Sequence, residues 1–93
     1  MDKEKIKALK KAAERGYEMA QTQLGVMYQY GQGVKQNYEK AVSWYRKAAE
    51  QGYPQAQNQL GYIYFHGQGV AQDDVEADRW FKLAKVEWKN RSK

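Results

Sequence analysis

The chain has 93 residues, a length that fits one small domain or part of a repeat array and leaves no room for a large catalytic fold. It contains no Cys and a single His, which excludes a disulfide framework, a thiol nucleophile and a multi-histidine metal site. Aromatic residues make up 14% of the chain, too many for a disordered segment. We therefore expect a folded domain that holds no cofactor and no metal.

The net charge is +5, from 16 Lys and Arg against 11 Asp and Glu. A basic balance suits nucleic acid, an anionic membrane surface or an acidic protein. The basic residues gather at the two ends of the chain, however, and such ends are usually solvated, so we do not expect nucleic acid as the partner. No apolar run approaches the roughly 18 residues of a membrane span, and the first residues lack the apolar region of a signal peptide. We expect a cytoplasmic protein without membrane contact.

The sequence repeats itself with a period of 36 residues. Segments 11–45 and 47–81 agree at about half of their positions, and the agreement includes Trp44 with Trp80 and Gly25 with Gly61. A period of this length is typical of solenoids built from helical hairpins. We assign 1–16 to an N-terminal half unit, 17–52 to a first repeat and 53–88 to a second repeat, whose last helix continues to about residue 90.

Five helices are predicted in chain order. The segment 2–14 aligns with the second helix of the first repeat and is expected to be helical. Helices near 19–30 and 54–66 open the two repeats, and Gly31 and Gly67 end them. Helices near 38–50 and 74–89 close the repeats; Asp73, followed by Glu76, is typical of a capping box at the last one.

The apolar residues of each helix recur on one face, which we expect to be buried. The first helix of each repeat carries Ala, Leu and Tyr four residues apart, at positions 20, 24 and 28 and again at 56, 60 and 64. The second helix carries Ala, Trp, an aromatic residue and Ala, at 41, 44, 45 and 48 and again at 77, 80, 81 and 84. We expect Trp44 and Trp80 to be largely buried. Glycine inside a helix costs about 1 kcal/mol relative to Ala, so Gly25 and Gly61 indicate close approach between helices.

These residues resemble the Sel-one-like repeat family, a relative of the tetratricopeptide repeat. The matching run begins Ala20-Gln-x-x-Leu-Gly-x-x-Tyr28-x-x-Gly31 and continues Lys40-Ala41-x-x-Trp44-Tyr-x-Lys-Ala48. The resemblance implies an all-α, right-handed α-α superhelical solenoid of five helices in antiparallel pairs. It also implies a protein that binds other proteins without chemistry of its own; many members of the family are bacterial.

Other motifs have plain structural interpretations. Gly31-x-Gly33 lacks the preceding strand and the third glycine of a phosphate-binding loop, so we interpret it as a turn. His66 has no second histidine or cysteine with which to form a metal site or a catalytic pair. The acidic residues near Asp73 fit a helix start, where carboxylates favour the helix dipole, and lack the calcium-loop pattern.

Candidate binding residues are sought where the two repeats differ, because matching positions serve the shared scaffold. Tyr62 and Phe65 are large residues that the repeat does not require, and exposed aromatic residues mark interfaces. The alternative for Phe65 is packing under the glycine loop or against the last helix. The predicted partner-binding residues are Thr22, Val26, Gln29 and Tyr30 on one helix and Asn58, Tyr62, Phe65 and His66 on the other.

The favoured function is binding of a protein or peptide on the concave face of the solenoid. A narrower alternative is an immunity-like or antitoxin-like protein that blocks a toxin enzyme. A nucleic-acid-binding module is supported by charge alone, and catalysis is not expected. Trp88, a large residue near the C-terminus, suggests weak self-association through the last helix.

Overall fold

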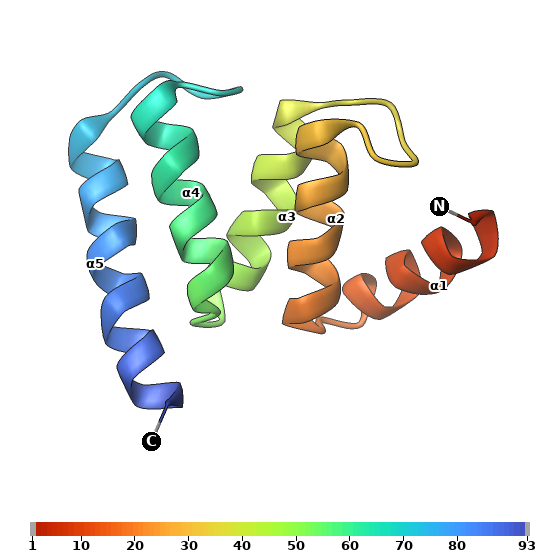
Figure 1. The fold of residues 1–93 in the computed structure, drawn as a ribbon, viewed down its shortest axis with the longest axis horizontal. Coiled ribbons are helices and arrows are strands. Elements are labelled where there is room, and N and C mark those ends of the chain that lie inside the picture. Colours follow the sequence, from red (N-terminus) through yellow and green to blue (C-terminus); the bar gives the residue numbers. More distant parts are fainter. Residues whose placement is uncertain (1, 93) are drawn as a thin grey trace.

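The computed structural model describes residues 2–92, which form five helices and no strands. The last four helices run alternately up and down, while the first lies inclined to the second (Figure 1). Each helix packs mainly on its neighbours in sequence, so the chain builds a row of helical hairpins. The predicted all-α superhelical solenoid is confirmed. The helices are α1 (Lys3–Glu14), α2 (Glu18–Tyr30), α3 (Tyr38–Glu50), α4 (Pro54–His66) and α5 (Asp74–Arg91).

The helix boundaries follow the turn residues of the sequence. Gly31 and Gly67 end α2 and α4 with left-handed φ angles of 68° and 70°, a conformation that glycine adopts without steric cost. Asn37 and Asp73 precede α3 and α5, and their side chains accept hydrogen bonds from the backbone N–H groups three residues later. The expected capping box at α5 is only half formed, because the carboxylate of Glu76 is bonded elsewhere.

Hydrogen bonds repeat with the same period as the sequence. The side chain of buried Gln21 donates to the backbone carbonyl of Ala13 at 3.0 Å, and that of Gln57 donates to the carbonyl of Ala49 at the same distance. Both bonds tie the first turns of a helix to the end of the preceding helix. The period of 36 therefore relates equivalent places in the structure, and corresponding residues can be compared directly.

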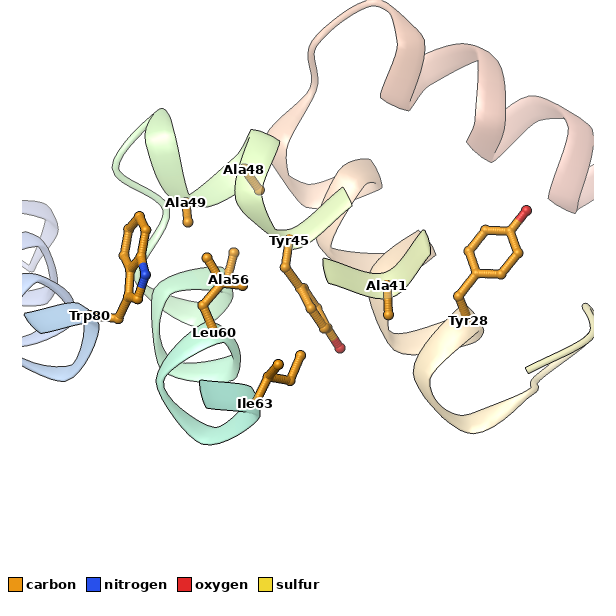
Figure 2. Close-up of a cluster of buried hydrophobic side chains, with 9 residues drawn as sticks. All are labelled: Tyr28, Ala41, Tyr45, Ala48, Ala49, Ala56, Leu60, Ile63 and Trp80. Carbon is orange, nitrogen blue, oxygen red and sulfur yellow. The ribbon is translucent and has the colours of Figure 1, made fainter. Parts of the chain in front are cut away.

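The main core lies between α3 and α4. Tyr45, Leu60 and Ile63 are fully buried there, with small alanines around them and Trp80 at the edge of the cluster (Figure 2). A Cβ atom added to Gly25 would lie 2.5 Å from the ring of Tyr45, which confirms the predicted close approach of α2 and α3. Gly61 stands in the same relation to Phe81, at 2.6 Å.

One expected core position is exposed, and the two tryptophans differ in depth. Trp80 is buried, whereas Trp44 is partly buried and packs against the core on both of its sides. In α1, Ala8 and Leu9 stand where α3 carries Trp44 and Tyr45, so less side-chain volume is available to cover Trp44. Phe81 is 38% exposed because no further helix of residues 2–92 packs against its outer side.

Candidate protein-binding site

Four predicted residues lie together on one exposed surface of α4. Asn58, Tyr62, Phe65 and His66 are all exposed, and we call this surface the α4 face. Tyr62 and His66 are one helical turn apart, and their ring centroids lie 4.3 Å from each other. Phe65 meets His66 edge-on, with 5.1 Å between centroids. Three rings thus form an aromatic cluster near the end of α4.

The corresponding residues of α2 offer less to a partner. Thr22 is half-buried and its hydroxyl donates to the carbonyl of Glu18, while Val26 packs against the main core. Gln29 is buried; its side-chain oxygen accepts from the hydroxyl of Tyr45 at 2.7 Å. These contacts give Gln29 a structural role. Tyr30, which is 59% exposed, is the large free side chain of the α2 set.

The two units differ here because they have different neighbours. The amide of Gln29 also donates to the side chain of Gln68, which belongs to the loop of the second unit. Phe65 is the counterpart of Gln29 in the second unit. A loop that covered Phe65 as the loop of Gln68 covers Gln29 would belong to a third unit, and residues 2–92 contain none. Phe65 is therefore 49% exposed.

A hollow that the sequence analysis missed adjoins the α4 face. It has a volume of about 650 Å³ and is lined by Asn58 of α4 and by the second half of α5. Trp88 and Val86 are more than half exposed at this hollow, and Lys85 and Lys89 add positive charge. Trp88 occupies the position that Gly52 holds in the first unit. This difference between the two units is the sequence signal that could have revealed the hollow. Self-association through Trp88 stays a prediction.

The last turn of α5 is tied to the first residue of α2. The guanidinium of Arg91 donates to both carboxylate oxygens of Glu18, at 2.7 and 3.2 Å, and lies 5.5 Å from the ring centre of Tyr53. Its hydrogen bond to Glu18 raises the pKa of Arg91 further. The pair is solvent-exposed, so it fixes the position of the helix more than it stabilises the fold.

Among residues 2–92 no group of three or more His, Asp or Glu side chains is placed to hold a metal ion. The buried Tyr45 has a raised pKa because burial disfavours its ionised form, so it acts as a hydrogen-bond donor to Gln29. None of the helices described is long and apolar enough to cross a bilayer.

Comparison with known proteins agrees with this architecture. A crystal structure of a Sel1 repeat protein from Oxalobacter formigenes is 40% identical, with a TM-score of 0.86 over 88% of this chain and 24% of the other. The structure of c5321, a protective antigen of uropathogenic Escherichia coli strains with an SLR fold, is 48% identical. Its TM-score is 0.83, over 85% of this chain and 17% of that one.

This chain thus spans about a quarter or less of the solved structures that it matches. No curated protein sequence matches it. The family model of the Sel1 repeat matches twice, over residues 18–53 and 54–85, which together cover most of the chain. Both matches include the glycine-ended first helix and the tryptophan-bearing second helix on which the fold depends, and this chain belongs to the Sel1 repeat family.

Proposed function

We propose that this chain binds a protein or peptide through the α4 face, supported by Tyr30 of α2, on the concave side of the solenoid. Sel1 repeats generally mediate protein–protein interactions and are typically non-catalytic. The observation that carries the proposal is the exposed cluster of Tyr62, Phe65 and His66. The first unit folds with a smaller or more polar side chain at two of these three positions, so the scaffold does not need the rings.

The cluster has the properties of an interaction hot spot. Aromatic side chains bury large areas on binding while they lose few rotatable bonds, and a few such residues carry most of the energy of an interface. The mutual contacts of the three rings hold them in place before a partner arrives. Asn58, one turn before Tyr62, adds hydrogen-bonding groups, and half-buried Thr22 and Val26 flank the site on α2.

The test is a pull-down with mass spectrometry that compares three versions of the protein. Tyr62→Ala with Phe65→Ala removes the cluster, and Val75→Ala with Leu83→Ala removes two exposed apolar residues of α5 as a matched control. A partner should be retained by the wild type and the control and lost by the double aromatic variant. With that partner purified, calorimetry should show binding at least about a hundredfold weaker, as expected when two hot-spot residues are truncated. Equal binding by both double variants would contradict the proposal.

The identity of the captured molecule separates the other hypotheses. A captured toxin enzyme would narrow the function to inhibition, as in an immunity protein. Captured nucleic acid, with affinity that falls steeply as salt is raised, would replace the proposal, because phosphate contacts release counterions. A cytosolic location stays a prediction of the sequence and can be checked by cell fractionation.

A further inference from the structure

A second candidate site lies at the other end of the molecule, between α1, α2 and α3. This cleft has a volume of about 310 Å³, and its lining includes Lys10, Glu14, Lys40, Ser43, Trp44 and Lys47. It shares no residue with the α4 face. Three lysines stand against one glutamate, so the lining carries a net charge of about +2 at neutral pH.

In the second unit, the residues equivalent to the cleft lining carry equal numbers of positive and negative charges. The period of 36 relates Lys10 to Arg46 and Lys40 to Glu76. Arg46 donates to the hydroxyl of Tyr64. The Glu76 carboxylate accepts the indole N–H of Trp80 at 3.1 Å and pairs with Arg79 at 3.2 Å. Here a carboxylate from the chain itself satisfies both the tryptophan and a neighbouring cation.

The first unit lacks that carboxylate. Lys40 replaces Glu76, four residues before the tryptophan, and a lysine cannot accept a hydrogen bond from an indole N–H. Within residues 2–92 no protein group accepts the indole N–H of Trp44, and this N–H reaches the solvent of the cleft. The ammonium of Lys47 lies 4.9 Å from the ring centre of Trp44, and that of Lys40 lies 5.4 Å from the ring centre of Tyr28. The cleft thus holds cations on aromatic surfaces and an unused donor.

We propose that this cleft docks an Asp or Glu side chain from an acidic segment of a protein partner. The incoming carboxylate takes the place that Glu76 holds in the second unit: it accepts the N–H of Trp44 and pairs with Lys40 and Lys10. Hydrogen bonds to a charged acceptor are about twice as strong as neutral ones, and complementary charge speeds association. Glu14, which also lines the cleft, repels a phosphate dianion more than a single carboxylate, and this disfavours free phosphate and phosphate monoesters. A phosphodiester of a nucleic acid carries one charge, as a carboxylate does, so the experiment tests it separately.

The test follows the indole N–H signals in ¹⁵N–¹H correlation spectra, with each of the three tryptophans assigned by substitution with Phe. Hexaglutamate is the probe, and hexaglutamine is its uncharged control. Hexaglutamate should shift the Trp44 signal in a saturable way and leave the Trp80 signal in place, because Trp80 is already bonded to Glu76. A Trp44 signal that does not move, or that moves equally with hexaglutamine, would overturn the proposal.

Two charge variants make the test specific. Lys40→Glu supplies the missing carboxylate from the chain itself and should weaken hexaglutamate binding at least tenfold. Lys35→Glu changes the net charge by the same amount at an exposed loop residue outside the cleft lining and should alter the affinity less than twofold. An unchanged Trp80 signal in both variants reports an intact fold. If both variants weakened hexaglutamate binding equally, the binding would depend only on the net charge of the protein, and the proposed site would be wrong.

The last part of the test asks whether the cleft prefers phosphate to a carboxylate. Inorganic phosphate and a single-stranded oligonucleotide should move the Trp44 signal less than hexaglutamate at equal concentration. A stronger response to either would assign the cleft to phosphate and overturn the acidic peptide. This result is independent of the α4 face, because Tyr62→Ala with Phe65→Ala should leave hexaglutamate binding intact.

Discussion

Tyr45→Phe removes a single oxygen atom from the centre of the core, and we expect a large effect on stability. The Tyr45 side chain is fully buried, and its hydroxyl donates to the side-chain oxygen of Gln29, which is only 3% exposed. Without the hydroxyl, a buried carbonyl oxygen has no partner, which costs about 1–3 kcal/mol. For a domain of this size each kcal/mol lowers Tm by about 4–8 °C, so a fall on the order of 10 °C is expected.

The second unit shows how this cost can be avoided. Phe65 and Phe81 occupy the positions of Gln29 and Tyr45, so both polar groups are replaced together by apolar rings. Gln29→Met combined with Tyr45→Phe imitates that replacement at nearly constant volume. Removing both partners of a buried hydrogen bond can be nearly neutral, so the double variant should be more stable than Tyr45→Phe alone.

The assay is a double-mutant cycle from urea and thermal melts of the four proteins, followed by far-UV circular dichroism. The amide of Gln29 also donates to Gln68, but Gln68 is only half-buried and water can replace that bond. We expect a coupling energy of about 1 kcal/mol or more between positions 29 and 45. A wild-type Tm for Tyr45→Phe, or strictly additive costs, would refute the structural role given to Gln29.

Three further predictions follow from burial, capping and ionisation. Trp80→Ala should cost about 3–5 kcal/mol and abolish the cooperative melt of so small a domain. Trp44→Ala removes a less deeply buried side chain and should cost less; equal damage at both sites would contradict the structure. Lys40→Glu places an acid three residues after Asn37 at the start of α3 and should raise stability by about 0.3–1 kcal/mol, and a lower Tm would count against this. Burial raises the pKa of Tyr45, so its contribution is fully present below about pH 10, where a free tyrosine begins to ionise, and is lost above it. In alkaline melts the wild type should therefore lose stability more steeply than Tyr45→Phe.

Much of the fold could be predicted because each unit repeats the same local rules. Gly31 and Gly67 end their helices in the left-handed conformation that the sequence suggested, and the helix ranges agree within a few residues. The glycines inside α2 and α4 correctly indicated close packing against a ring of the next helix. These features depend on neighbours a few residues away or in the same hairpin, which the sequence shows directly.

The candidate sites depended on longer-range neighbours, and there the sequence was a weaker guide. Gln29 was expected on the binding face, but Tyr45 and Gln68 enclose it, and no local pattern distinguishes a buried glutamine from an exposed one. The open cleft beside Trp44 was missed because the repeat predicts equal burial for Trp44 and Trp80.

By itself the sequence determined the period, the five helices, the capping residues and the aromatic surplus on α4, since all of these are encoded by residue type and spacing. Only the tertiary structure decided which equivalent residues are covered. A side chain in a solenoid is buried by the adjacent unit, and the two units of this chain have different neighbours. The loop of the second unit covers Gln29, whereas its counterpart Phe65 is exposed. The indole of Trp80 donates to the carboxylate of Glu76, whereas the ring of Trp44 lies beside a lysine.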